Sequence, residues 1–191
     1  MRNYLRSCLF LLSLAFLTHA GGAADPKLEP DFVRIFNGRD LTGWSYSDTD
    51  KFDGKTKSSD GRFSVGNGVL LVHAREPRAN KKIWTVQKFP RDFVLRFDFR
   101  AAVGADSGVY LRRPQVQIRD YLRAGPYKDL KQYRPQEWNA VEVVVKDDVA
   151  VTTCNGEILG KPMKLPEDGP IGFEADLGQM EYRNIRIKET P

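Results

Sequence analysis

The sequence predicts an all-β protein built as a sandwich of two antiparallel sheets. Short segments in which apolar and polar residues alternate recur along the chain, as in strands that bury one face. Clusters of Gly, Pro, Asn and Asp separate these segments at short spacing, which is typical of turns. Beyond the N-terminal leader, no stretch has the pattern of a long amphipathic helix. About ten short strands with such turns favour a two-sheet sandwich.

The first 20 residues are typical of a secretory signal peptide. Arg2 and Arg6 form a positive start, residues 8–17 are an apolar run, and Thr18-His19-Ala20 supplies a small-x-small cleavage site, with alternative ends as far as Ala24. The apolar run is about half of the roughly 20 residues that a membrane-spanning helix needs. We therefore expect cleavage, export to the periplasm or the medium, and no membrane span in the mature chain.

The clearest expected strand is residues 93–100. Its phenylalanines and its leucine fall on one face, whereas Arg96, Asp98 and Arg100 fall on the other. Asn155-Gly156 is a strong hairpin signal. Residues 45–61 and 119–136 are expected to be loops, and the absence of repeats or composition breaks predicts one domain over residues 25–191. The other expected strands are residues 32–36, 63–73, 83–89, 108–112, 116–120, 138–146, 149–154, 171–176 and 182–188.

The inventory of soft metal ligands limits the chemistry. The chain has two Cys and two His, and Cys8 and His19 lie in the expected leader, which leaves His73 and Cys154. A Cys/His zinc site needs at least three such ligands, and an intrachain disulfide needs two cysteines, so both are excluded within one mature chain. Carboxylates, Tyr, Lys or Arg are therefore expected to carry any chemistry.

The charge distribution argues against a nucleic-acid partner. Without Arg2 and Arg6, the 30 basic residues fall to 28, against 25 acidic ones. The two signs are interleaved along the chain, unlike the basic stripe of a nucleic-acid-binding surface.

Candidate site residues lie on the polar face of the central strands. If residues 93–100, 108–112 and 115–120 form neighbouring strands, their polar side chains share one surface. Planar polar groups beside an aromatic ring suit the hydroxyls and faces of a sugar. The alternative is an ordinary solvated sheet face. The side chains expected there are Asp98, Arg100, Tyr110, Arg112, Gln115 and Gln117.

Three other chemistries find little support. The acidic residues 48, 50 and 53 do not match the spacing of a calcium-binding EF-hand loop. His73 has no Gly-x-Ser-x-Gly nucleophile to serve, and Cys154 more readily packs than reacts. The chain also lacks the Glu-x-Asp-x-Glu run of many β-sandwich glucanases, so a glucanase acting on unoxidised glycans is a third and weaker reading.

Eight segments, in the same order, resemble the motifs of the 3-keto-disaccharide hydrolase family and span residues 32–189. Any one match is weak, but eight in order are specific. They are residues 36–44 (FNGRDLTGW, family LFNGKDLSGW), 92–100 (DFVLRFDFR, DFELRLEFR), 104–112 (GADSGVYLR, GGNSGIFLR), 115–120 (QVQIRD, EVQILD), 125–127 (GPY, GALY), 135–139 (PQEWN, PAGEWN), 155–157 (NGE) and 181–187 (EYRNIRI, EFRNIRI).

The resemblance implies a concanavalin A-like jelly roll that is usually exported and that cleaves glycosides already oxidised at C3. The ketone acidifies the C2 proton, a base removes it, and the C1 substituent leaves by elimination. The resemblance also implies that a divalent cation with oxygen ligands can assist the enolate. Asp120, Asp98 and Glu174 are the expected bases or metal ligands. The expected sugar-binding residues are Arg100, Arg112, Tyr110, Gln115, Gln117 and Asn139.

Two departures from the family pattern leave a second function open. The glutamate of the EVQILD motif is Gln115 here, and the family's IGLQ segment, often followed by a His, reads IGFEAD over residues 171–176. Glu174 or Asp176 could offset the acid lost at position 115 if they lie close to it. The alternative is a carbohydrate-binding or interaction module without catalysis.

Overall fold

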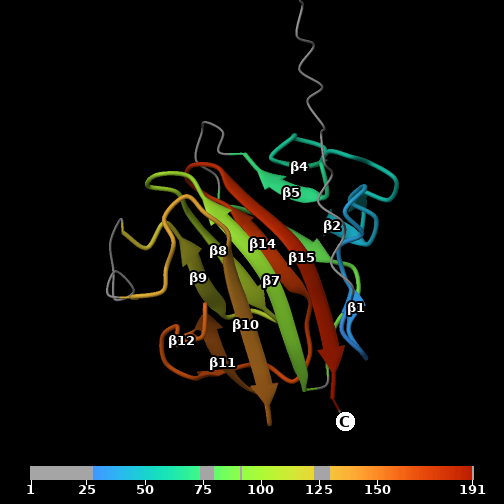
Figure 1. The fold of residues 1–191 in the computed structure, drawn as a ribbon. Helices are drawn as coiled ribbons and strands as arrows, with labels where there is room; N and C mark the ends of the chain where they lie inside the picture. Colours follow the sequence, from blue (N-terminus) through green and yellow to red (C-terminus); the bar gives the residue numbers. More distant parts are fainter. Residues whose placement is uncertain (1–27, 74–79, 91, 123–129, 191) are drawn as a thin grey trace, which may run out of the picture.

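The computed structural model describes residues 28–73, 80–90, 92–122 and 130–190, so the expected signal peptide lies outside the described residues. Two antiparallel sheets are packed face to face, and in Figure 1 β7, β10 and β15 lie in front of β8, β9 and β14. The described part of the chain contains no helix, and hence none that could span a membrane. The predicted all-β sandwich is confirmed.

The first sheet has nine strands. Strand β7 lies near its middle, with β10 on one side and β15 on the other. In order, the sheet contains β12 (Glu157–Ile158), β11 (Val149–Cys154), β10 (Asn139–Lys146), β7 (Phe93–Ala101), β15 (Met180–Glu189), β5 (Val69–Val72) and β4 (Phe63–Gly66), with β1 (Val33–Arg34) beside β15 and β13 (Met163–Lys164) beside β11.

The second sheet has six strands and carries the candidate site. Strand β14 is paired with β6 on one side and β8 on the other. In order, the sheet contains β3 (Asp50–Lys51), β2 (Trp44–Ser47), β6 (Lys81–Thr85), β14 (Ile171–Ala175), β8 (Asp106–Leu111) and β9 (Gln115–Arg119). Residues 45–61, where the sequence predicted only a loop, contain most of β2 and all of β3.

Aromatic rings from both sheets fill the space between the layers. Phe97 of β7 contacts Phe173 of β14 with ring centroids 5.8 Å apart, and Phe173 lies 4.7 Å from Tyr182 of β15. Each is at most 1% exposed. Burying such a side chain contributes about 1.5–3 kcal/mol, so this contact fixes how the two sheets sit on each other.

The hairpin turns follow from residues that tolerate a left-handed backbone. Asn155 and Gly156, with φ of 49° and 86°, join β11 to β12 as the sequence predicted. Asp147 and Asp148, with φ of 51° and 57°, join β10 to β11 in the same manner. Two successive residues with positive φ match the twist of the flanking strands.

Candidate functional site

The outer face of the six-stranded sheet gathers four side chains around Glu174. Their neighbours along each strand, such as Ile83, Val109 and Phe173, are fully buried in the core, so the alternating side chains face outward. Register places Glu174 opposite Lys82 of β6. We call this group the Glu174 cluster, and it consists of Lys82, Trp84, Tyr110, Gln115 and Glu174.

The carboxylate of Glu174 receives hydrogen bonds on both oxygens. The Tyr110 hydroxyl donates to Oε1 at 3.0 Å, and Gln115 Nε2 donates to Oε2 at 2.8 Å. Lys82 Nζ lies 3.3 Å from Oε1, and the Glu174 side chain is only 6% exposed. Removing a carboxylate from water is costly unless donors and an opposite charge replace the water. The two donors and the ammonium together replace the water that this carboxylate loses on burial.

Tyr110 remains protonated beside this carboxylate. Burial, and then the negative charge of Glu174, raise the pKa of Tyr110 well above its usual range. Lys82 Nζ lies 4.8 Å from the centre of the Tyr110 ring, and the Trp84 ring meets that ring edge to face at 5.7 Å. The Tyr110 hydroxyl is therefore a fixed proton donor at neutral pH.

Two glycines let the side chains of the cluster lie across the sheet. A Cβ at Gly172 would lie 2.5 Å from the Trp84 ring, and a Cβ at Gly108 would collide with the amide of Gln115. Gly172 stands opposite both Trp84 and Tyr110, and Gly108 lies on β8, between the strands that carry Glu174 and Gln115. A larger residue at either position would therefore displace a member of the cluster.

Gln117 extends this polar face by one more position along β9. Its Nε2 donates to Asp106 Oδ1 at 2.7 Å and to the Ser107 carbonyl at 2.6 Å. The structure thus brings Tyr110, Gln115 and Gln117 to the same face, as predicted, and adds Glu174 to them.

Asp98 and Arg100 lie on the opposite side of the molecule, so the prediction that they share this surface is wrong. Strand β7 belongs to the nine-stranded sheet, whereas β8 and β9 belong to the other. Asp98 pairs with Arg183 at 3.1 Å, and Arg100 pairs with Glu181 at 2.6 Å. Alternation gave the correct outward direction for both side chains, but it does not say which sheet a strand joins.

Arg112 is buried, so its predicted place on the polar face is also wrong. It has a positive φ of 61° at the end of β8, where the chain leaves the strand geometry. Its guanidinium donates to the Phe89 carbonyl at 2.8 Å, to Asp148 at 2.7 Å and to the Pro166 carbonyl at 2.7 Å. Arg112 therefore joins three loops from inside the protein.

Asp120 and Asn139 are buried as well and do not reach the Glu174 cluster. Asp120 accepts hydrogen bonds from the Gly104 amide at 2.9 Å and from the Tyr133 hydroxyl at 3.2 Å. Asn139 is fully buried, and its amide bonds to both the N–H and the carbonyl of Arg134. Their expected position on a sugar-binding face is wrong, since both side chains hold loops.

The two remaining soft ligands behave as structural side chains. His73 Nε2 shares a hydrogen bond of 2.7 Å with Ser64, at the edge of the nine-stranded sheet. Burial raises the pKa of the Cys154 thiol to about 12, which keeps it protonated and unreactive at neutral pH.

Lys82 and Trp84 belong to the cluster but were not among the site residues predicted from the sequence. The strand was expected to begin at residue 83, but it begins at Lys81 and ends at Thr85. The signal was present in Lys82-Ile83-Trp84, because Ile83 at the centre is fully buried and its neighbours must face outward.

The residues of the cluster do not fit a divalent cation. Hard cations prefer several oxygen ligands, with carboxylates foremost. The described residues hold no group of three or more His, Cys, Asp or Glu side chains placed to bind a metal. Glu174 is the one carboxylate of the cluster, and the Lys82 ammonium beside it would repel a cation.

Comparison with known proteins agrees with this fold. Residues 31–188 match the model of the 3-keto-alpha-glucoside-1,2-lyase-like domain. No curated protein sequence matches the chain.

Solved structures show the same architecture at low sequence identity. Two candidate glycosyl hydrolases from Parabacteroides distasonis ATCC 8503 align with TM-scores of 0.64 and 0.61, both at 19% identity. The first alignment covers 84% of this chain and 94% of that protein, the second 83% and 99%. A β-glucanase of Bacillus licheniformis aligns with a TM-score of 0.52 at 11% identity, over 83% of this chain and 97% of that one. The fold is therefore a glucanase-type jelly roll.

Proposed function

Because the chain belongs to the family of 3-keto-alpha-glucoside-1,2-lyase-like domains and is thus a carbohydrate-active protein, we propose that it is an exported enzyme that cleaves 3-keto-glycosides at the Glu174 cluster. The observation that carries the proposal is the buried Glu174 carboxylate, which is held between a tyrosine hydroxyl and an ammonium. A base, an acid and a cation within one cluster are the groups that this elimination needs.

The chemistry of the substrate determines what each group does. A ketone at C3 makes the C2–H bond acidic, because the electron pair left at C2 moves onto the carbonyl oxygen as an enolate. When the carbonyl forms again, the bond between C1 and the glycosidic oxygen breaks. The products are a 1,2-unsaturated 3-keto sugar and an alcohol, and addition of water to the double bond yields the free 3-keto sugar.

Three residues of the cluster match these steps. Glu174 accepts the C2 proton, Lys82 stabilises the negative enolate oxygen, and Tyr110 donates its proton to the leaving oxygen. The hydrogen bond of 3.0 Å between Tyr110 and Glu174 then returns the proton from the carboxyl group to the phenolate. Both residues regain their starting states without an outside acid or base.

Trp84 supplies an apolar surface for the sugar ring. Its indole packs edge to face against Tyr110 and is half-buried on the sheet. Pyranose rings present apolar C–H faces that pack on aromatic side chains. This position holds the ring next to the base, and such orientation can account for a large share of the rate.

The exchanged residues at positions 115 and 174 favour an enzyme. The family pattern places Glu at the position of Gln115 and Gln at the position of Glu174, the reverse of this chain. Because the two side chains are hydrogen-bonded at 2.8 Å, the site still contains one carboxylate and one amide. Relative to the family pattern, the carboxylate and the amide of this hydrogen-bonded pair have exchanged positions, so the pair still contains an acid.

A second candidate function is sugar binding without cleavage. The observation that favours it is that both oxygens of Glu174 already accept hydrogen bonds, as in a group that only orients its neighbours. In that case the protein binds 3-keto and unoxidised sugars but releases no product from either.

The test is incubation of the mature protein with a 3-keto-disaccharide and with the matching unoxidised disaccharide. We expect sugar release from the 3-keto compound alone, with and without a chelator. Glu174→Gln should lower kcat by about 10²–10⁴-fold, the usual contribution of a general base. Lys82→Met should also lower kcat, because it removes the charge that faces the enolate.

Glu181→Gln is the matched control, since Glu181 lies in the other sheet, where it pairs with Arg100, and should leave turnover unchanged. Absence of release from every 3-keto-glycoside tried would refute the enzyme. Export is tested separately, by the N-terminal sequence of the protein recovered from the periplasm or the medium, which should begin between residues 21 and 25.

A further inference from the structure

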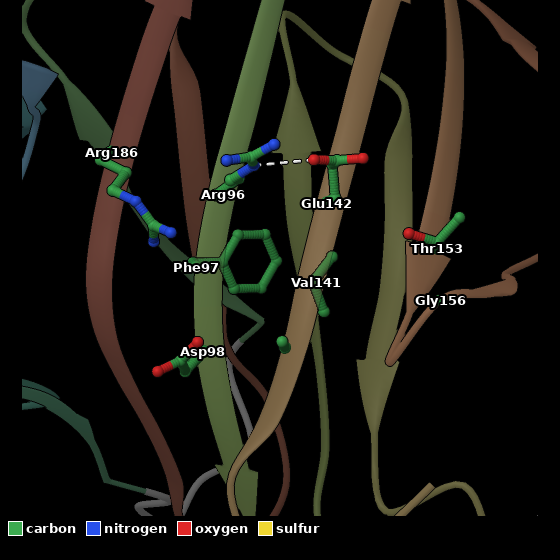
Figure 2. Close-up of a pocket in the computed structure, with 9 residues that line it drawn as sticks. Arg96, Phe97, Asp98, Val141, Glu142, Thr153, Gly156 and Arg186 are labelled. Carbon is green, nitrogen blue, oxygen red and sulfur yellow. Dashed lines mark hydrogen bonds and ion pairs between the residues drawn. The ribbon is translucent and has the colours of Figure 1, made fainter. Parts of the chain in front are cut away.

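A hollow of about 360 Å³ lies on the outer face of the nine-stranded sheet, on the other side of the sandwich from the Glu174 cluster. In Figure 2, the ion pair of Arg96 and Glu142 lies above it, Asp98 lies below, and Thr153 projects from the adjoining strand. The volume falls near the lower end of the roughly 300–1,000 Å³ that is typical of small-molecule sites.

Small residues create this hollow. Register places Ala140 of β10 opposite Asp98 of β7, and Gly156 follows the end of β11. Neither residue has a side chain long enough to fill the space, whereas the next outward-facing position along β10 carries the long side chain of Glu142. The small residues thus leave a space on the sheet surface that polar side chains surround.

The walls present polar atoms that have no partner within the described chain. Glu142 accepts a hydrogen bond from Arg96 through Oε2 at 2.7 Å, and among the described residues Oε1 accepts none. Asp98 accepts hydrogen bonds from Arg183 and Asn184 through Oδ2. Among the described residues, none donates to its Oδ1. Two carboxylate oxygens on opposite walls can therefore accept hydrogen bonds from a ligand between them.

The walls are also held in place before any ligand arrives. Arg96 lies between Glu142 and Glu29, with Nη1 3.3 Å from the latter, and its guanidinium stacks on the Phe32 ring at 4.8 Å. Arg186 binds Glu29 through two hydrogen bonds of 2.7 Å and 2.6 Å. Preformed walls lose little side-chain entropy when a ligand binds.

The charges of the hollow select a neutral ligand. Its lining includes two guanidiniums, of Arg96 and Arg186, and two carboxylates, of Asp98 and Glu142. An anion would face the carboxylates, and a cation would face the guanidiniums. An apolar group would take water from the two carboxylate oxygens that accept no hydrogen bond from the described residues. A compound with several hydroxyl groups can donate to the carboxylates and accept from the guanidiniums.

We propose that this hollow is a second carbohydrate site, which binds one neutral sugar unit through its hydroxyl groups. The choice of a sugar among neutral polyols rests on the proposed function, because a carbohydrate-active enzyme meets glycans. Bound here, a glycan is held by the face that does not carry the Glu174 cluster, so the site anchors the protein to a chain without occupying the catalytic face.

The test is a titration of the isotope-labelled mature protein with maltose and with cellobiose, followed by amide NMR. We expect shifts at Arg96, Asp98 and Thr153 for at least one of the two sugars. Ala140→Leu should abolish these shifts, because its side chain would fill the hollow, and it should fold because Ala140 is exposed at the surface. Glu174→Gln should keep them, which separates this site from the catalytic one.

Absence of shifts at the hollow with both sugars would overturn the proposal, as would shifts that persist in Ala140→Leu. Turnover of a 3-keto-disaccharide by Ala140→Leu, measured in parallel, should match the unmodified protein. A protein that shows no turnover but keeps these shifts would refute the proposed enzyme while supporting the second site.

Discussion

Gln115 Nε2 donates a hydrogen bond of 2.8 Å to Glu174 Oε2 across the intervening strand β8. The bond crosses β8 at Gly108, where any Cβ would collide with the Gln115 amide. A glutamine and a glutamate that are 59 positions apart in the sequence thus form one unit of the candidate site.

Gly108→Ala should break this contact without disturbing the backbone, since φ at Gly108 is not positive. We expect kcat/KM to fall by roughly 10- to 100-fold, which corresponds to a charged hydrogen bond of about 1.5–3 kcal/mol. Gly66→Ala is the matched control, because its Cβ would make an ordinary contact of 3.5 Å with Leu71. Equal activity of the two variants would show that the Gln115 contact is not needed.

Exchanging the two residues should preserve the site in part. Glu174→Gln alone removes the base, whereas Gln115→Glu alone places two carboxylates in contact and raises the pKa of one of them. The single Gln115→Glu variant should therefore reach its maximum rate at higher pH. The double variant should regain at least about 10-fold over Glu174→Gln, measured as kcat on a 3-keto-disaccharide. If the activity loss of the double variant equals the product of the losses of the two single variants, positions 115 and 174 are not coupled.

Glu29 should make stability depend on pH at the acid end. The hydrogen bond from Arg186 lowers the pKa of Glu29 from 4.5 to about 2. The folded state binds the proton less well than the unfolded state, so the stabilisation is complete above pH 4.5 and is lost as the pH falls toward about 2.

Glu29→Gln should accordingly lower the free energy of unfolding at neutral pH, by about 1 kcal/mol or less because the carboxylate is partly exposed. Urea denaturation of both proteins over a pH series measures the difference. The two curves should converge near the lower pKa, and a constant offset at every pH would rule out the linkage.

Arg112 should matter for stability and not for sugar binding. Arg112→Met leaves Asp148 and two carbonyl groups without their donor, so we expect a loss of about 3 kcal/mol in the free energy of unfolding. Arg113→Met, one residue away and exposed, should change stability by less than about 0.5 kcal/mol. A normal free energy of unfolding with a raised KM in Arg112→Met would instead restore its role in the site.

Several features of the fold could be predicted from the sequence because their causes are local. The alternation in residues 93–100 gave both the strand and its buried face, since successive side chains point to opposite sides of any strand. Asn155-Gly156 gave the hairpin because the turn demands two positive φ values. Tyr110 and Gln115 were correctly placed together because β8 and β9 are consecutive strands and pair directly.

The rest of the candidate site depends on pairing between strands that are distant in the sequence. Alternation assigns a side chain to a face, but the sheet that a strand joins is decided by packing across the whole core, and this decision put Asp98 on the far side from Gln115. Likewise, Lys82 and Glu174 meet only because β14 inserts between β6 and β8. The sequence by itself determined the class of fold and the family, because both follow from local patterns and motifs. Only the tertiary structure decided that the Glu174 carboxylate lies in hydrogen-bonding contact with Gln115.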